Sequence, residues 1–279
     1  MRKSVKDIID KKKSGNKISV ITAYDYTMAS LCDKAGVDIL LVGDSAGMVM
    51  LGYENTIPVT MEQMILFTEA VSRARQNTLV VADMPFMSYQ ASISDAIANS
   101  GRLIKAGADA IKLEGGRIVT PTIQAIVETG IPVMGHIGFQ PQTTTLNQGY
   151  RVQAKTKDAA ITLIEDAKAL EEAGVFSIAL EMVTSEVSKI ISKSVSVPTI
   201  GIGSGSYCDG QVLVVHDVLG MYDKIKPKFV KRYLSLSDQI TKAITNYKLD
   251  IESGRFPSKE NWFSMDKAEL DKLREEIDI

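Results

Sequence analysis

Short apolar runs, many of them β-branched, alternate along the chain with longer helical patterns. The apolar runs predict strands at 18–23, 38–42, 78–82, 110–113, 132–135, 176–180, 198–202 and 211–214. Helical periodicity separates most of them, as at 61–75, 92–105, 120–129 and 157–172. Such alternation is typical of a parallel sheet with helical crossovers. Eight strands favour a closed α/β TIM barrel, (β/α)8, with an open doubly wound sheet as the alternative.

Acidic residues recur at one position relative to these strands. Three strands follow a helical stretch that ends in an Ala-Gly pair, with Gly36, Gly107 and Gly174 as the glycines. Glycine suits the left-handed residue just past a helix end. An acid stands seven or eight residues after each glycine, at Asp44, Glu114 and Glu181, and Asp83 ends a fourth strand. The carboxyl ends of barrel strands open on one catalytic face, so these four acids are expected to gather there.

Both ends of the chain carry helical patterns outside this alternation. Residues 4–13 predict an N-terminal capping helix that plugs the bottom of the barrel, with Ser4 and Asp7 forming a capping box. Residues 224–247 are expected to be the closing helix of the barrel, and a further helix is expected over 265–279. We therefore expect one domain over 1–279, with a barrel at about 18–247 and a C-terminal helical appendage at about 248–279.

Composition narrows the class of protein. The 279 residues are 45% hydrophobic and 24% charged, which is ordinary for a globular protein. A formal net charge of −2 does not favour nucleic acid, which usually requires a basic surface. Two distant cysteines, Cys32 and Cys208, exclude a disulfide framework and argue against a zinc site. Neither a signal peptide nor an apolar run of ~18 residues is recognisable, so we expect a cytoplasmic protein without a membrane partner.

The four strand-end acids suggest a metal site. A single acid at a strand end is often only a helix N-cap. Four acids on one rim would repel one another unless a cation lies among them or some are protonated. Carboxylate oxygens, without a nearby cysteine, favour Mg²⁺ over Zn²⁺. Asp44 and Asp83 are the best direct ligands, and Glu114 is expected to bind the metal directly or through water.

Lys112 lies two residues before Glu114, so both side chains are expected to leave the strand toward the barrel interior. A buried lysine must be paired. Three interpretations remain open: an ion pair with the neighbouring acids, a cation that holds a substrate oxygen, or an amine that forms a Schiff base.

His136 and Glu181 end two further strands. His136 either bonds a backbone carbonyl or contacts substrate. Glu181 follows an apolar strand, and an apolar surrounding would make it a suitable general base for removing a proton next to a carbonyl. The glycine-rich segment 201–205 follows the seventh strand, where barrels often bind an anion, although a plain tight turn fits equally well.

Six motifs in order identify a family resemblance. They are GDSAGMVMLGYENTIPVT, VVADMPFMSY, AIKLEGG, PVMGHIGFQPQ, LEMV and PTIGIGSGSYCDGQVLVVHDVLG, between about residues 24 and 222. Together they resemble the ketopantoate hydroxymethyltransferase family. The resemblance implies a TIM barrel of the phosphoenolpyruvate/isocitrate-lyase type, in agreement with the fold predicted above.

The resemblance also implies an activity. Such an enzyme transfers a one-carbon unit from 5,10-methylenetetrahydrofolate to 3-methyl-2-oxobutanoate through a Mg²⁺-stabilised enolate, giving 2-dehydropantoate in pantothenate synthesis. The keto acid and folate are then the small-molecule partners. Family members commonly assemble as homodecamers, as pentamers of dimers.

The family's site residues can be carried over to this sequence by its motifs. They imply metal ligation by Asp44, Asp83 and Glu114, and keto-acid binding by Asp44, Ser45, Asp83 and Lys112. They imply Glu181 as the proton acceptor, with His136 at an active-site position. Two residues depart from the pattern of many members: Ser204 replaces an alanine and Phe139 a leucine, and an effect of Ser204 on the folate side is expected to be slight.

Other functions remain open. A different carbon–carbon bond enzyme on the same scaffold, such as a phosphonomutase-like relative or a lyase, would also gather acids around Mg²⁺. An aldolase would use Lys112 as a Schiff-base amine, and borohydride with a keto acid would trap it. A non-catalytic ligand-binding barrel would bind the metal or keto acid without turnover.

Overall fold

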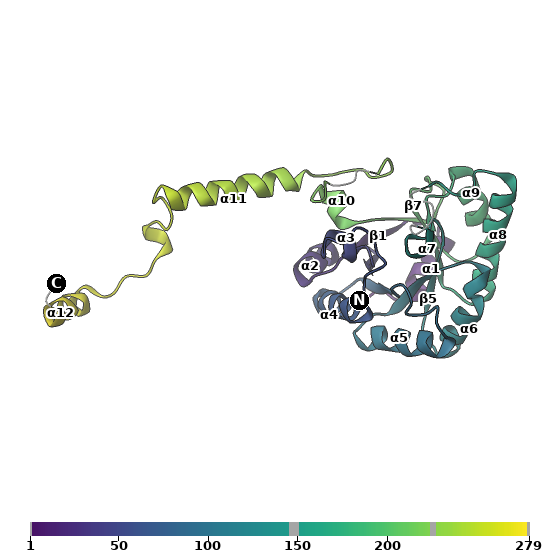
Figure 1. The fold of residues 1–279 in the computed structure, drawn as a ribbon, viewed down its shortest axis with the longest axis horizontal. Helices are drawn as coiled ribbons and strands as arrows, with labels where there is room; N and C mark the ends of the chain where they lie inside the picture. Colours follow the sequence, from purple (N-terminus) through teal and green to yellow (C-terminus); the bar gives the residue numbers. More distant parts are fainter. Residues whose placement is uncertain (1, 145–150, 224–226, 278–279) are drawn as a thin grey trace. The chain divides into compact units, whose positions relative to one another are not determined.

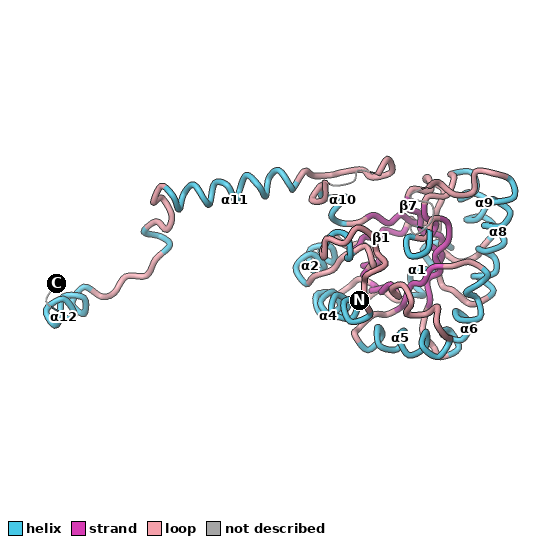
Figure 2. The backbone as a smooth tube through the Cα atoms, in the orientation of Figure 1, coloured by secondary structure: helices cyan, strands magenta, loops and turns pink. Residues whose placement is uncertain are grey.

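Eight parallel strands close into a barrel in the order in which they occur along the chain (Figure 2). The computed structural model describes residues 2–144, 151–223 and 227–277. Its strands are β1 (Ile18–Thr22), β2 (Ile39–Val42), β3 (Leu79–Asp83), β4 (Ala110–Glu114), β5 (Val133–Gly138), β6 (Ser177–Glu181), β7 (Thr199–Ile202) and β8 (Gly210–Leu213). Strand β1 pairs with both β2 and β8, which closes the ring. The predicted TIM barrel is confirmed, and the open sheet is excluded.

Helices cover the outside of the barrel (Figure 1). The longer ones are α2 (Tyr26–Lys34), α4 (Met61–Ala74), α5 (Ile93–Lys105), α6 (Thr120–Glu128), α8 (Lys157–Glu172) and α9 (Ser185–Ser194). The shorter ones are α3 (Ala46–Val49), η1 (Arg117–Val119), α7 (Pro141–Thr144) and α10 (Val215–Leu219). Helices α4, α5, α6 and α8 begin and end within one residue of the ranges predicted for them. The described segment 203–209 joins β7 to β8 without a helix.

Alternate side chains of the strands build two apolar cores. Leu40 of β2 belongs to the larger cluster, which includes the outer helices, whereas its neighbour Ile39 belongs to the cluster that fills the barrel. Strands β2, β3 and β4 are buried along their whole length, which explains their uninterrupted apolar runs. Ala110 lies in the interior cluster, so the two-residue period directs Lys112 and Glu114 inward as well.

The N-terminal helix α1 (Val5–Lys13) closes the bottom of the barrel. Ser4 and Asp7 form the predicted capping box, with the Ser4 N–H donating to Asp7 Oδ2 at 2.7 Å. Ile8 is fully buried and belongs to the interior cluster. The plug is therefore held by an apolar side chain inserted among the strands.

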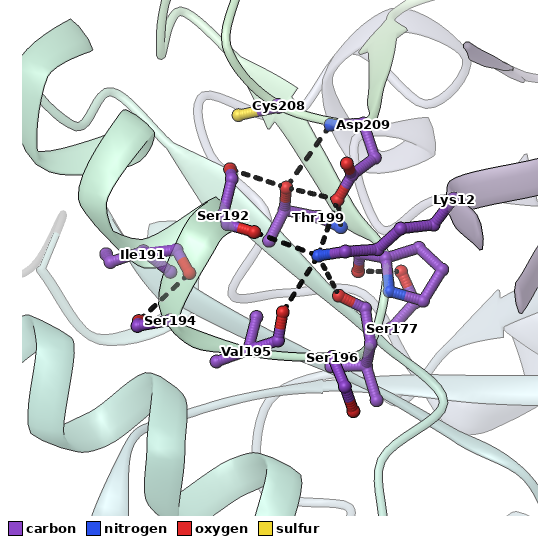
Figure 3. A network of polar contacts seen from close by, with 12 residues as sticks. Lys12, Ser177, Ile191, Ser192, Ser194, Val195, Ser196, Thr199, Cys208 and Asp209 are labelled. Carbon is purple, nitrogen blue, oxygen red and sulfur yellow. Dashed lines mark hydrogen bonds and ion pairs between the residues drawn. The ribbon is translucent and has the colours of Figure 1, made fainter. Parts of the chain in front are cut away.

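A lysine on α1 anchors this helix to the end of α9 and to the segment that leads into β7. Lys12 Nζ donates to the carbonyl oxygens of Ser192, Val195 and Val197 at 3.0, 3.0 and 2.9 Å (Figure 3). It also pairs with Asp209 Oδ2 at 3.0 Å. The ammonium thereby satisfies carbonyl groups at and beyond the C-terminal end of α9.

The chain divides into two compact units, Met1–Tyr233 and Leu234–Ile279. The second unit contains α11 (Leu236–Glu252), η2 (Lys259–Asn261) and α12 (Lys267–Ile277). A single domain over 1–279 with a barrel boundary near 247 stays a prediction, and the structure assigns α11 to the second unit. Among the helices that the structure describes, none is long and apolar enough to cross a membrane.

The predicted helix over 224–247 is wrong in its first half. Residues 224–226 lie outside the described residues, and 227–235 are not helical. The backbone there bonds to the barrel unit instead, because the Tyr233 N–H donates to the Val218 carbonyl at 2.8 Å. Arg232 adds a bond from Nη2 to the Tyr222 carbonyl at 3.0 Å. These tertiary bonds replace the local helical ones, and α11 begins only at Leu236.

Candidate active site

The closed barrel brings all the predicted site residues to one end. Asp44 lies in the turn after β2, Asp83 ends β3 and Glu114 ends β4, and these three strands are neighbours. Strand β5 carries His136 opposite Glu114 in register, and Glu181 ends β6. Asp44, Asp83 and Glu114 are 5%, 2% and 3% exposed, so each carboxyl group is withdrawn from water.

Lys112 and Asp83 form a buried ion pair. Lys112 Nζ lies 3.0 Å from Asp83 Oδ1, and Asp83 Oδ2 accepts the backbone N–H of Asp44 at 3.1 Å. Burial alone would lower the pKa of Lys112, but the carboxylates of Asp83, Asp44 and Glu114 outweigh it and raise that pKa. Burial raises the pKa of Asp83, and Lys112 offsets only part of this effect. A lysine held in its charged form is a poor Schiff-base nucleophile, which favours the ion-pair and oxygen-binding interpretations.

His136 connects the buried acids to Glu181. Its Nδ1 lies 3.4 Å from Lys112 Nζ and 3.6 Å from Glu114 Oε1, and its Nε2 lies 3.2 Å from Glu181 Oε2. Burial and the Lys112 charge lower the pKa of His136, so the neutral ring is favoured. An ammonium can only donate, so Nδ1 is the acceptor and the ring proton is on Nε2, facing Glu181. His136 thus lies between Lys112, Glu114 and Glu181, and its role stays a prediction.

Glu181 is the most accessible carboxylate of this group. Its side chain is 15% exposed, compared with 1% for Glu114 and 3% for Asp83. A base that exchanges protons with a substrate needs such access. The role of Glu181 as a base stays a prediction.

Ser45 lies in the turn after β2. Its Oγ is 2.8 Å from the hydroxyl of Tyr24, a residue that is 1% exposed. The nearby N–H groups of Ala46 and Gly47 donate to carbonyls within the turn. A Cβ at Gly43 would lie 2.8 Å from Ser45 Oγ. The glycine therefore makes room for the hydroxyl.

The donor set fits a hard divalent cation in its chemistry. Glu114 Oε1 is buried and accepts no hydrogen bond from the residues described, and Asp83 Oδ1 has no partner among them other than the Lys112 ammonium at 3.0 Å. Burial, and next the charge of Asp44, raise the pKa of Glu114 well above its usual range. A cation bound among these carboxylates would offset the cost of burying them and the repulsion between them. Within 2–144, 151–223 and 227–277, however, no three acidic, histidine or cysteine side chains are already arranged around a metal position.

The sequence pattern did not identify two buried residues that contact the acids of the site. Gln142 and Tyr89 are 0% and 2% exposed and contact Asp44 and Glu114 directly. Hydrophobic periodicity gives no sign that a glutamine or a tyrosine shortly after a strand contacts the acids of a site. Their only signal was membership of the motifs PVMGHIGFQPQ and VVADMPFMSY.

The glycine-rich segment after β7 is a tight turn that supports β6. Ser204 is fully buried, donates from Oγ to the Leu180 carbonyl at 2.6 Å and accepts the Val183 N–H at 3.1 Å. These groups flank Glu181. Phe139, the other departure from the family pattern, is also fully buried, and its N–H donates to the Glu181 carbonyl at 2.8 Å.

Two solved structures share the fold of this chain. The chain is similar to a phosphonopyruvate hydrolase solved in complex with oxalate and Mg²⁺, with a TM-score of 0.63, 12% identity, and 99% and 96% of the two chains covered. It is also similar to 2,3-dimethylmalate lyase, a member of the PEP mutase/isocitrate lyase superfamily, with a TM-score of 0.57, 14% identity, and 99% and 100% covered. These likenesses show the fold: the chain is a closed (β/α)8 barrel, as those two proteins are.

Sequence comparison then gives the family. The family model described as "Ketopantoate hydroxymethyltransferase" matches residues 2–259. A 3-methyl-2-oxobutanoate hydroxymethyltransferase of Nitrosopumilus maritimus is 74% identical over 277 residues, covering 99% of each chain. Enzymes of that name from Cenarchaeum symbiosum and Clostridium botulinum are 58% and 53% identical, covering 94% and 98% of this chain and 99% and 100% of theirs. The chain belongs to the ketopantoate hydroxymethyltransferase family.

Proposed function

We propose that this protein transfers a hydroxymethyl group from 5,10-methylenetetrahydrofolate to 3-methyl-2-oxobutanoate. The products are 2-dehydropantoate and tetrahydrofolate, in pantothenate and coenzyme A biosynthesis. The observation that carries the proposal is the contact between Glu181 and His136, because it links an accessible carboxylate to the buried Lys112, Asp83 and Glu114. Family membership supports the same activity.

Removal of the C3 proton of the keto acid involves Glu181, His136 and Lys112 in different roles. Glu181 accepts the C3 proton of the keto acid, and the electron pair of that C–H bond moves into the C2–C3 bond. The neutral His136, with its proton on the side of Glu181, orients the carboxylate. Lys112 provides a fixed positive charge beside substrate oxygens, and Asp44, Asp83 and Ser45 complete the keto-acid site.

A divalent metal completes this proposal. Asp44, Asp83 and Glu114 would hold Mg²⁺, which when bound supplies a Lewis acid that polarises the keto group. Carbon C3 forms a bond to the methylene carbon, both carbon–nitrogen bonds between that carbon and folate break, and water supplies the hydroxyl oxygen of the product. The proton taken from C3 and one proton of the water end on the two folate nitrogens.

Product analysis tests the transfer. With ¹³C-methylene-labelled folate donor, keto acid and Mg²⁺, we expect ¹³C NMR to show the label in a hydroxymethyl group of 2-dehydropantoate. Glu181→Gln should produce none while keeping the native circular-dichroism spectrum. Cleavage of the keto acid without incorporation of label would instead indicate a lyase on this scaffold and contradict the proposal.

We also propose a cytoplasmic homodecamer, a pentamer of dimers, on the basis of the family resemblance alone. Light scattering coupled to size exclusion should then give about ten times the chain mass of 30.4 kDa. A mass of one or two chains at micromolar concentration would contradict this assembly.

A further inference from the structure

Gln142 is a fully buried amide at the carboxyl end of the barrel, in helix α7 just after β5. Its Nε2 donates to Asp44 Oδ2 at 2.8 Å and to the Met84 carbonyl at 2.9 Å. Both amide protons are therefore used, and one of them holds an acid of the site. The bond to Asp44 is charge-assisted, which makes it stronger than a neutral hydrogen bond.

The chemistry of its neighbours determines which way the amide points. Oε1 lies 3.0 Å from the hydroxyl of Tyr89, whose one proton is shared between Oε1 and the Glu114 carbonyl, also at 3.0 Å. In the opposite orientation, the amide oxygen would face the Asp44 carboxylate and the Met84 carbonyl, and all three groups are acceptors. Only the observed orientation gives both the Asp44 carboxylate and the Met84 carbonyl a donor, so these two groups fix the amide.

The same residue also reaches the second acid. The backbone N–H of Gln142 donates to Glu114 Oε2 at 3.2 Å, and the Tyr89 hydroxyl accepts the backbone N–H of Glu114 at 3.2 Å. One oxygen each of Asp44 and Glu114 is therefore occupied by Gln142. The remaining oxygen of Glu114, Oε1, accepts no hydrogen bond from a described residue and stays available.

We propose that Gln142 is a positioning residue that orients Asp44 and Glu114 and thereby sets the affinity of the site for a divalent cation. This inference rests on the metal role assigned under the proposed function. Outer partners that fix the orientation of ligating side chains typically contribute about 10- to 100-fold to metal affinity. Gln142 need not touch the metal or the substrate to have this effect.

Binding of Mn²⁺ without substrate tests the proposal. The free ion is measured by electron paramagnetic resonance on the full chain. Gln142→Met keeps the length and the backbone N–H but loses the amide, and it should raise the Kd for Mn²⁺ by about 10- to 100-fold. Gln142→Asn, which keeps an amide that is one methylene too short to reach Asp44, should raise it similarly and provides a second variant if the first does not fold.

A matched control separates this role from a purely structural one. Ser177→Ala also removes a buried hydrogen bond, from Ser177 Oγ to the Pro198 carbonyl at 2.8 Å, at the opposite end of β6. It should lower the Tm and leave the Kd unchanged. If both Gln142 variants bind Mn²⁺ as the wild type does, Gln142 is only structural and the inference is overturned. If the wild type itself binds no Mn²⁺, the metal role fails as well.

Discussion

Burial determines the charge states of individual residues at the carboxyl end of the barrel. Lys112 is 5% exposed and remains protonated because Asp83, Asp44 and Glu114 surround it. His136, equally buried, has the Lys112 ammonium at 3.4 Å and is favoured in its neutral form. The charge of Lys112 therefore favours a neutral His136, which can donate a proton from one ring nitrogen and accept one at the other.

Replacing Lys112 should lower the free energy of unfolding, because the buried acids lose their only nearby positive charge among the described residues. Lys112→Met, studied without metal, should lower the free energy of unfolding by about 3–5 kcal/mol because Asp83 loses its buried partner. Without the ammonium, the pKa of Asp83 rises further, so the folded variant holds a proton that the unfolded chain releases. The pKa of Asp83 is already raised in the wild type, so both folded proteins hold this proton at mildly acidic pH, and the deficit should grow only as the pH rises above that raised value.

Urea unfolding at pH 5 and pH 8 measures this effect. The double variant Lys112→Met/Asp83→Asn, which removes the unpaired charge, should recover part of the loss at pH 8. An equal loss in the single and double variants would show that the ion pair does not govern stability here.

Asp38 illustrates the opposite case at the bottom of the barrel. Burial alone would raise its pKa, but bonds from Lys11, Ser19 and Lys3 lower it to about 2. The lowered value means that Asp38 stabilises the fold above the ordinary aspartate pKa near 3.9, and that this contribution is lost as the pH falls toward 2. Asp38→Asn should reduce stability at pH 6 by about 1–2 kcal/mol, after a discount for solvent screening, but by much less near pH 2. Thermal unfolding across this pH range checks the sign, and a constant difference would contradict it.

At the scale of elements, backbone bonds hold the end of β6 in place around Glu181. Met182 adopts a left-handed backbone with φ of 49°, which a non-glycine residue rarely takes. Its N–H donates to the Ile202 carbonyl at 2.8 Å, and its carbonyl accepts the Gln153 N–H at 2.7 Å. A Cβ at Gly138 would lie 2.3 Å from the Glu181 carbonyl oxygen, so only glycine allows this approach. The surrounding strands therefore impose the conformation that presents Glu181.

Ser204→Ala should destabilise this end of β6 by about 1–3 kcal/mol, because the buried Val183 N–H loses its acceptor. Ser177→Ala should cost less, about 0.5–1.5 kcal/mol, since the Pro198 carbonyl keeps the Ile178 N–H as a partner at 2.9 Å. Urea unfolding compares the two variants. Equal losses would show that Val183 finds another partner.

The elements with strong local signals were the predictable ones. The apolar run at 38–42 and the helix at 157–172 were placed correctly, because burial on both faces and helical periodicity leave a clear pattern. The non-helical segment before α11 was missed, since the bonds of Tyr233 and Arg232 are tertiary. Gln142 was missed for the same reason: its partners come from three other strand ends, and no local pattern records them.

At the scale of the whole molecule, the two units differ in how they are stabilised. The barrel unit has two buried cores, whereas α11 and α12 contain no buried residue. Exposed apolar side chains occur at regular spacing on α11, at Ile240, Ile244, Tyr247 and Ile251. A helical segment without a core of its own is marginal in water.

A peptide of residues 234–279 should therefore be largely unfolded by far-ultraviolet circular dichroism, whereas the chain 1–233 should keep the barrel signal and a cooperative thermal transition. A peptide with a cooperative, helical transition at low concentration would contradict this view of the second unit.

In the proposed mechanism, Glu181 removes the C3 proton of a keto acid at a site that requires Mg²⁺. Proton NMR of 3-methyl-2-oxobutanoate in D₂O tests this step without folate. The C3 proton signal should disappear with wild-type protein and Mg²⁺, and persist with EDTA or with Glu181→Gln. Exchange that survives EDTA would contradict the metal role of Asp44, Asp83 and Glu114, and exchange that survives Glu181→Gln would contradict the base.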